Sequence, residues 1–303
     1  MDMPHSSINY TPLRRALSAN AVFSLLTGSV MVISSSTVAS LLGHGVEPLI
    51  FVVIGAGLLP FGAFVAWLAS RSTPEPLLAL AVSIGDLIWV AGSVVLLAVA
   101  SEFLKPAGLV ATVVVAMFVL GFAIGQLKGI ARLYSQGSGG RFRVCFDINS
   151  NGNANMIWGN LADLGAISRF APTLVSSSLR SDSGPTAGCI RDCVDTAGRS
   201  WSERCKLIDH EQRTLVMEFL ANDPGFPFPF VEMSGGWSVH DGAHGARVRV
   251  WWEGMPKFPR LNSLLLPLLA WQARCQFPAV VAALSGESKL SDQVRLHPVI
   301  APC

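Results

Sequence analysis

Charge is scarce in this chain of 303 residues, and its scarcity is uneven. Only 14% of the residues are charged, 51% are hydrophobic, and the mean hydropathy is +0.48. Soluble domains carry roughly a quarter charged residues. From Leu17 to Leu127 the only ionisable residues are His44, Glu47, Arg71, Glu75, Asp86, Glu102 and Lys105. After Arg141 the charge density is ordinary, so a membrane half is expected to precede a soluble half.

Sequence motifs for metal binding, phosphate binding and catalysis are also absent. The six cysteines form neither a CxxC pair nor the Cys/His spacing of a zinc site. The sequence also contains no phosphate-binding loop and no Ser/His/Asp arrangement typical of a catalytic triad. The net charge of +2 comes without a basic stripe, which argues against nucleic acid as a partner. His240, Asp241 and His244 lie around an Asp-Gly turn signal, and we expect an exposed hairpin tip there. No metal and no cofactor is therefore predicted.

Long apolar runs, in contrast, are present. Four segments approach the roughly 20 apolar residues that cross a bilayer. They span about 17–42, 49–69, 77–99 and 107–127. The first contains the polar stretch VISSSTVAS, typical of a helix that faces other helices. A signal peptide that starts at Arg14 and Arg15 is the alternative for this segment.

Basic residues alternate between the two sides of these spans. Arg14 and Arg15 precede the first span, Arg71 follows the second, and four Lys or Arg residues follow the fourth. The loop after the first span has none, and the loop after the third has only Lys105. The positive-inside rule therefore predicts a cytoplasmic N-terminus and a cytoplasmic C-terminal half.

Asp86 is the one carboxylate well inside a predicted span. An ionisable group at that depth is a candidate functional site, although a structural hydrogen bond to the first span or to Trp89 would also explain it. The stretch DLIWVAGS resembles the third span of bacterial four-helix integral membrane proteins with a DLxWVxGS-like pattern. The resemblance implies a multi-pass protein of the bacterial inner membrane. A sensor or small transporter around Asp86, regulated by the soluble half, is one functional hypothesis.

The soluble half changes to the alternating pattern of strands. The Gly/Ser-rich stretch 135–140 is the predicted linker. RFRVCFDI is the first predicted strand, and one or two short helices are predicted within 153–170. Six further strands are expected at about 174–181, 188–196, 199–209, 214–221, 235–241 and 246–253, and a long helix at about 259–285. The remainder, 287–303, is predicted to be a tail.

The order of these pieces resembles a known superfamily. The matching segments are MIWGNLADLGAISRFAP, GCIRDCVDTAGRSWSERCKLID, GGWSV and GARVRVWWEG. Over about 141–286 they resemble the SRPBCC or START-like superfamily, which includes polyketide-cyclase-like and lipid-transfer proteins. The resemblance implies a helix-grip fold, in which a curved antiparallel sheet wraps the last helix around an apolar cavity. The predicted fold is thus a four-helix transmembrane bundle over 1–134 followed by an α+β helix-grip domain.

Candidate cavity residues follow from a predicted hairpin centred on Ala197. This register pairs Cys193 with Trp201 and Arg191 with Glu203 on the more apolar face. A buried ion pair is costly to keep for stability alone, so Arg191 and Glu203 are candidates to orient a ligand, with a purely structural pair as the alternative. Alternation adds further candidates on the neighbouring strands, namely Met217, Phe219, Trp237 and Trp252.

The segment GFPFPF is unusually apolar for a loop. Its two prolines exclude a central strand, and the fold places it at the cavity entrance. Phe226, Phe228 and Phe230 are therefore candidates for a gate that touches lipid, or for a cap folded inward over the core.

Two functions remain for the soluble half. The first is binding of a hydrophobic ligand, such as a lipid, a quinone or a polyketide-like molecule, in a cavity held at the membrane. The second is a cyclase or dehydratase, with Arg191 and Glu203 as the reacting groups. Binding is favoured because only that one pair could supply acid–base chemistry.

Overall fold

The computed structural model describes residues 9–134, 141–180, 184–287 and 296–297. The chain divides into two compact units. Asn9–Leu133 form the helical unit, and the described residues from Tyr134 onward form the sheet unit. The predicted linker, 135–140, lies outside the described residues, as does most of the predicted tail, 287–303.

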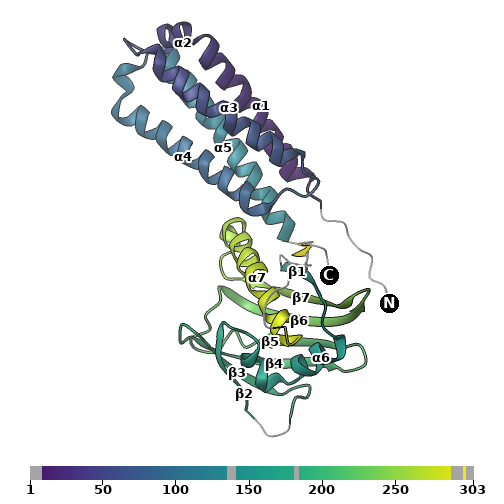
Figure 1. Ribbon diagram of the computed structural model, residues 1–303. Coiled ribbons are helices and arrows are strands. Elements are labelled where there is room, and N and C mark those ends of the chain that lie inside the picture. Colours follow the sequence, from purple (N-terminus) through teal and green to yellow (C-terminus); the bar gives the residue numbers. More distant parts are fainter. Residues whose placement is uncertain (1–8, 135–140, 181–183, 288–295, 298–303) are drawn as a thin grey trace. The chain divides into compact units, whose positions relative to one another are not determined.

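The helical unit is built from long apolar helices (Figure 1). They are α1 (Thr11–Ile33), α2 (Ser35–Leu42), α3 (Pro48–Ser70), α4 (Pro76–Val99) and α5 (Pro106–Tyr134), with a 3₁₀ turn, η1 (Ser101–Phe103), before α5. α3, α4 and α5 each begin with proline, whose fixed φ suits the first helical position. α1, α3, α4 and α5 are each long and apolar enough to cross a membrane. They correspond to the four predicted spans.

The prediction of one continuous span over 17–42 is wrong at Ser34. α1 ends at Ile33 and α2 begins at Ser35, because Ser34 has φ −116° and ψ 29°. Ser34 is the first of three consecutive serines. Serine hydroxyls compete for backbone hydrogen bonds and weaken a helix interior. The helix that follows this break, α2, is only 8 residues long.

Glycine lets α1 and α3 approach closely. A Cβ placed on Gly55 of α3 would lie 2.7 Å from the carbonyl oxygen of Gly28 on α1. No larger residue fits at that point without moving a backbone. Close contact between small residues is how helices associate where the hydrophobic effect is absent.

The sheet unit contains one antiparallel sheet. Its strands are β1 (Phe142–Ser150), β2 (Leu174–Leu179), β3 (Ile190–Asp195), β4 (Ser200–Asp209), β5 (Thr214–Phe219), β6 (Phe230–Gly242), β7 (Gly245–Pro256) and the short β8 (Leu296–His297). They are ordered β2-β3-β4-β5-β6-β7-β1-β8. β8 falls within the predicted tail and pairs with β1. All seven predicted strands are present, although β6 begins five residues earlier than expected.

Helices complete the sheet unit. α6 (Ala154–Ala162) and the 3₁₀ helix η2 (Leu164–Arg169) connect β1 to β2, and η3 (Pro259–Leu261) leads into the long α7 (Asn262–Leu284). Phe277 of α7 packs against Trp237 and Trp252 of the sheet, with ring centroids 5.4 and 5.1 Å apart. The unit therefore has the predicted helix-grip fold (Figure 1). Residues 259–284 also have the length and hydropathy of a membrane span. α7 buries one side, including Leu266, Ala273 and Val281, whereas Leu264, Leu268 and Trp271 are exposed.

The predicted register of the β3–β4 hairpin is confirmed. Arg191 pairs with Glu203 and Cys193 pairs with Trp201. A slip of one residue would have moved these side chains to the opposite face of the sheet.

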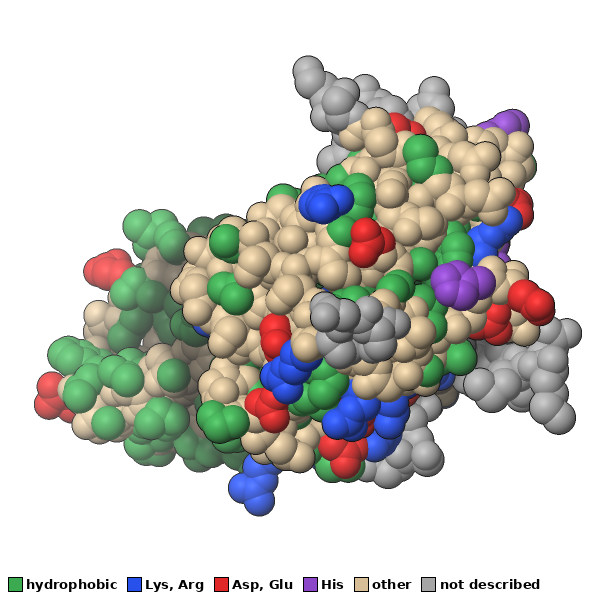
Figure 2. Space-filling model, turned by 90° about the horizontal axis from the view of Figure 1, so that it is seen from below, with side chains coloured by type: hydrophobic (Ala, Val, Ile, Leu, Met, Phe, Trp, Pro, Cys, Tyr) green, Lys and Arg blue, Asp and Glu red, His purple; other side chains and the backbone are tan. Residues whose placement is uncertain are grey.

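The other face of these strands carries exposed ion pairs. Arg180 contacts Asp192 at 2.9 Å, and Glu218 contacts both Arg204 at 3.2 Å and Lys206 at 3.4 Å. Figure 2 shows Lys and Arg side chains beside Asp and Glu side chains on one surface of the molecule. Exposed pairs of this kind contribute little stability, so their main effect is to keep this face polar.

Candidate ligand-binding cavity

A cavity of about 290 Å³ lies between the sheet and α7. Its wall is mainly aromatic and aliphatic. The aromatic lining residues are Phe142, Trp201, Phe219, Phe228, Phe230, Trp237, Trp252 and Phe277. Small-molecule sites are typically concave and mainly apolar, with polar groups that orient the ligand. The polar residues of this wall are Thr173, Arg191, Asp195, Thr196, Arg199, Glu203, Gln272 and Gln276.

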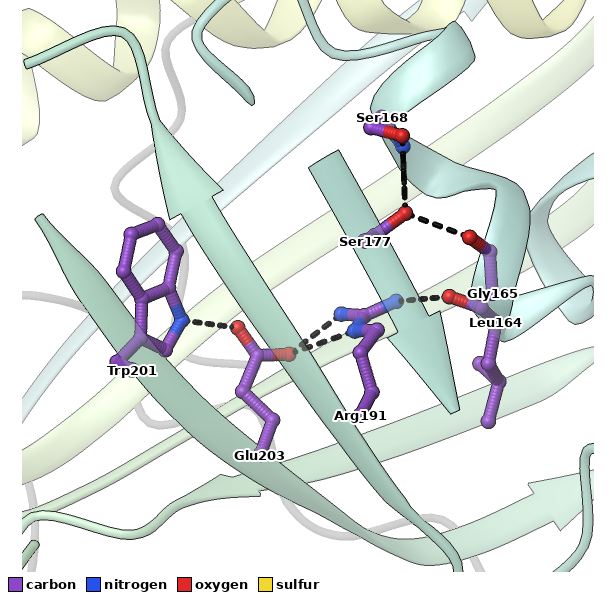
Figure 3. A network of polar contacts seen from close by, with 7 residues as sticks. All are labelled: Leu164, Gly165, Ser168, Ser177, Arg191, Trp201 and Glu203. Carbon is purple, nitrogen blue, oxygen red and sulfur yellow. Dashed lines mark hydrogen bonds and ion pairs between the residues drawn. The ribbon is translucent and has the colours of Figure 1, made fainter. Parts of the chain in front are cut away.

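Arg191 and Glu203 form a buried ion pair in the cavity wall. Their exposed fractions are 8% and 4%. Arg191 donates to Glu203 Oε2 from Nε at 3.2 Å and from Nη2 at 2.5 Å, and its Nη1 donates to the carbonyl oxygen of Leu164 at 3.3 Å. Trp201 Nε1 donates to Glu203 Oε1 at 2.6 Å. Both carboxylate oxygens therefore have donors within the protein (Figure 3).

A second set of contacts fixes η2, the segment whose Leu164 carbonyl oxygen accepts a hydrogen bond from Arg191. The hydroxyl of Ser177, on β2, donates to the carbonyl oxygen of Gly165 at 2.7 Å and accepts from the backbone N–H of Ser168 at 3.0 Å (Figure 3). Gly165 directly follows Leu164 in η2. The position of the carbonyl that holds Arg191 is thus tied to the edge strand β2.

Burial and charge set the protonation states around the pair. Burial is the largest single influence on the pKa of Arg191 and lowers it, but the opposing influences together, led by the adjacent Glu203 carboxylate, raise this pKa. Burial, assisted by Glu203, raises the pKa of the Cys193 thiol to about 12. Cys193 is therefore a protonated thiol at neutral pH, which is a poor nucleophile.

Two glycines of β6 create room for tryptophan rings. Gly235 pairs with Trp252 and Gly236 with Trp251 on β7. A Cβ on Gly235 would lie 2.8 Å from Trp252, and one on Gly236 would lie 2.0 Å from Trp251. Neighbouring residues of a strand face opposite sides, so one indole covers β6 on the cavity side and the other covers it on the outer side.

The FPFPF segment folds onto the cavity wall. The ring of Phe228 lies edge-on to Trp201 at 5.4 Å and to Phe219 at 5.8 Å between centroids. Phe226 contacts Phe228 at 5.4 Å. Phe230 is the first residue of β6, is 2% exposed and stacks on Phe142 at 4.6 Å. These contacts favour the inward-folded cap over an open lipid-facing gate.

The structure brings most of the predicted site residues to one cavity. Those in its wall are Arg191, Trp201, Glu203, Met217, Phe219, Phe228, Phe230, Trp237 and Trp252. Cys193 and Phe226 are not in the wall. Cys193 is 1% exposed in the core, and the ring of Phe226 contacts the rings of Phe219 and Phe228. Ligand contact by any of these residues stays a prediction.

Sequence reasoning missed the helical side of the cavity. Leu266, Ala270, Ala273 and Phe277 of α7 line it. Their spacing of four, three and four residues places them on one face of the helix, and this periodicity could have identified them. Asp195 and Arg199, which form an ion pair at 2.7 Å across the β3–β4 turn, also lie in the wall.

The described part of the chain contains no group of three or more His, Cys, Asp or Glu side chains that could hold a metal. His240 is an exposed residue near the end of β6, and His244 is exposed in the turn between β6 and β7. Asp241, also near the end of β6, forms an ion pair with Arg213 at 2.9 Å.

Comparison with known proteins identifies the sheet unit. Residues 141–279 match the family described as polyketide cyclase / dehydrase and lipid transport. This part of the chain is a polyketide cyclase/dehydrase and lipid transport domain. The match begins just before β1 and ends within α7, so it takes in the cavity. No curated protein sequence matches the chain.

Similar solved structures each cover about half of the chain. The di-domain ARO/CYC BexL from the BE-7585A biosynthetic pathway is 19% identical, with a TM-score of 0.38; the match covers 48% of this chain and 45% of BexL. Ara h 8.0201 is 15% identical with a TM-score of 0.40, covering 48% of this chain and 97% of that one. Norcoclaurine synthase from Thalictrum flavum is 17% identical with a TM-score of 0.39, covering 48% and 85%.

The domain match supports ligand binding or cyclase chemistry as the general role of this cavity. The long apolar helices of the helical unit indicate a multi-pass membrane protein.

Proposed function

We propose that the polyketide cyclase/dehydrase and lipid transport domain binds a hydrophobic small molecule or lipid, while the helical unit anchors it in a membrane. The observation that carries the proposal is the cavity of about 290 Å³ with its aromatic wall. Burial of apolar ligand surface against such a wall contributes about 25 cal/mol per Å² before the costs of association. Ligands in this class include lipids, quinones and polyketide-like molecules.

The hydrogen bonds of the ion pair support binding over catalysis. Glu203 accepts hydrogen bonds on both oxygens, from Arg191 and from Trp201. A general base must be able to reach a proton of the substrate, and here both carboxylate oxygens are already engaged. The pair therefore suits a fixed polar point in the wall better than a proton carrier.

The proposal includes an orientation. The basic residues that flank the spans favour a cytoplasmic N-terminus and a cytoplasmic ligand-binding domain. An inner membrane location would give the domain access to membrane-dissolved ligands. Accessibility of cysteines introduced before α1 and into the turn after α2 to a membrane-impermeant thiol reagent tests this orientation in intact cells.

A cyclase or dehydratase remains the second candidate, because Arg191 and Glu203 line the cavity. The change of both Arg191→Ala and Glu203→Gln separates the candidates once a ligand is known. Retained binding with loss of product formation would favour the enzyme. Loss of affinity with no product from either protein would favour binding.

The deciding experiment identifies what the cavity holds. The full chain is purified in mild detergent, extracted and examined by mass spectrometry, together with Ala270→Phe and Cys275→Phe. Ala270 lines the cavity, whereas Cys275 is exposed on the same helix. We expect a hydrophobic compound in the original protein and in Cys275→Phe that is depleted in Ala270→Phe.

This comparison removes the lipid that adheres to the helices, since all three proteins carry the same helical unit. Identical extracts from the three proteins, together with no displacement of a fluorescent hydrophobic probe by membrane lipids, would overturn the proposal.

A further inference from the structure

A second cavity, of about 340 Å³ and open on one side, lies between the helices of the helical unit. Its wall takes side chains from α1, α3, α4 and α5, and most of them are apolar. Asp86 on α4 is the one ionisable residue in this wall and is 4% exposed. A buried carboxylate at a cavity in a membrane-spanning unit requires a physical explanation.

Two amide side chains hold this carboxylate in place. Asn20 Nδ2 donates to Asp86 Oδ2 at 2.8 Å, and Gln126 Nε2 donates to the same oxygen at 3.1 Å. The amide oxygens are occupied in turn: Ser24 donates to Asn20 at 3.1 Å and Ser83 to Gln126 at 2.8 Å. Ser24 therefore fixes the Asn20 amide with its N–H group toward Asp86, which is an arrangement that suits an acceptor. The hydroxyl of Ser83 is shared between Gln126 Oε1 and the carbonyl oxygen of Ala79, at 2.8 and 2.9 Å.

One oxygen of the Asp86 carboxylate accepts no hydrogen bond from the described residues, and the carboxylate has no positively charged partner among them. Among the described residues, no hydrogen bond reaches Asp86 Oδ1 and no ion pair includes Asp86. The basic residues closest in the sequence, Arg71 and Lys105, lie outside the helices, beyond the ends of α3 and α4. A buried charge without a partner is strongly unfavourable, so a cation in the cavity would complete the site.

The wall around Asp86 suits an organic cation. Phe23, Phe61 and Trp89 line the same cavity, and cations are attracted to aromatic faces. A bare metal ion would need several oxygen ligands, whereas most of this wall is carbon. Trp89 Nε1 is also buried and has no hydrogen-bond partner within the described residues, so an acceptor on the ligand could pair with it.

We propose that the helical unit binds an amphipathic amine in this cavity, with the ammonium group donating to Asp86 and the apolar body packed among the aromatic side chains. This site is separate from the cavity of the sheet unit, and the proposal does not depend on the ligand of that domain.

The test uses the full chain in phosphatidylcholine nanodiscs and two probes of equal size. 2-Phenylethylamine, charged at pH 7, and neutral 2-phenylethanol are titrated calorimetrically, with empty nanodiscs as the blank. We expect the amine to bind and the alcohol to bind at least about tenfold more weakly. Asp86→Asn should reduce the affinity for the amine by about thirtyfold or more, because a desolvated charge pair is lost.

Two glycine variants, Gly57→Leu and Gly121→Leu, test the proposal independently if Asp86→Asn does not fold. A Cβ on Gly57 or on Gly121 meets nothing within 4 Å, but only Gly57 lines the cavity. Gly57→Leu should abolish binding of the amine and Gly121→Leu should leave it unchanged. Equal binding of amine and alcohol, no binding of the amine, equal effects of the two leucines, or a response to Na⁺ alone would overturn the proposal.

Discussion

Trp201 Nε1 donates a hydrogen bond of 2.6 Å to Oε1 of Glu203, two residues further along the same strand. Residues two apart on a strand share a face, so the indole and the carboxylate lie next to each other in the cavity wall. With Arg191 on the other oxygen, Glu203 is held from both sides.

Removal of one member of the ion pair should destabilise the sheet unit. Arg191→Met leaves a buried carboxylate with a single donor, and we expect the free energy of unfolding to fall by about 3–5 kcal/mol. Six of the eight tryptophans lie after residue 140, so urea unfolding followed by tryptophan fluorescence reports mainly on this unit. The double change Arg191→Met with Glu203→Leu should recover most of the loss. A double variant as unstable as the single one would contradict this account.

The cap formed by Phe228 should affect both stability and binding. Phe228→Ala removes contacts with Trp201, Phe219 and Phe226. We expect a loss of about 1–2 kcal/mol, below the 3–5 kcal/mol of a fully buried phenylalanine, and weaker binding of a fluorescent hydrophobic probe. Phe258→Ala is the control, because Phe258 is 55% exposed. Equal effects of the two changes would show that the cap has no special role.

The buried thiols should resist alkylation in the folded protein. Burial raises the pKa of Cys193 to about 12 and that of Cys205 to about 11, so few thiolates form at pH 8. Cys275 is exposed. Iodoacetamide treatment at pH 8 followed by peptide mass spectrometry should find Cys275 modified and the other two intact until denaturant is added. Rapid modification of Cys193 in the native protein would argue against this burial.

The same two thiols should contribute to alkaline unfolding. Their pKa values in the folded state lie above the ordinary value of 9.0, so loss of the proton favours the unfolded chain. The contribution to stability is complete below about pH 9 and declines as the pH rises toward 11. Replacement of both Cys193 and Cys205 by alanine should reduce the fall in the free energy of unfolding over this range. An unchanged pH dependence would exclude these thiols as its source.

The glycine at 236 should not tolerate a side chain. Gly236→Ala places a Cβ 2.0 Å from the Trp251 ring, and we expect a loss of about 1–3 kcal/mol from overpacking. Gly159→Ala in α6 is the control, since a Cβ there meets nothing within 4 Å and alanine favours helix. Urea unfolding of both variants measures the difference. A neutral Gly236→Ala would mean that the indole can move aside.

The strand side of the cavity could be predicted because its signals are local. Alternating residues on either side of the Ala197 turn were sufficient to pair Arg191 with Glu203 correctly. The same alternation led to Trp237 and Trp252, which meet at Phe277 of α7.

Other features depend on contacts that sequence patterns do not show. The apolar face of α7 is visible in the sequence, but which of its residues face the cavity depends on how the helix lies on the sheet. Cys193 shares a face with Arg191 and yet lies in the core, because the cavity does not extend to it. The break at Ser34 and the early start of β6 at Phe230 follow from local backbone geometry within otherwise apolar stretches.

The engaged ion pair has a consequence for selectivity. Because Arg191, Glu203 and Trp201 direct their hydrogen bonds to each other and to the backbone, we expect these three residues to select a ligand by its size and outline rather than by its polar groups. A homologous series of apolar compounds should therefore bind with affinity that rises with each added methylene and then falls sharply once the cavity is full. If the proposed binding role holds, the domain should accept a range of related ligands and exclude larger ones.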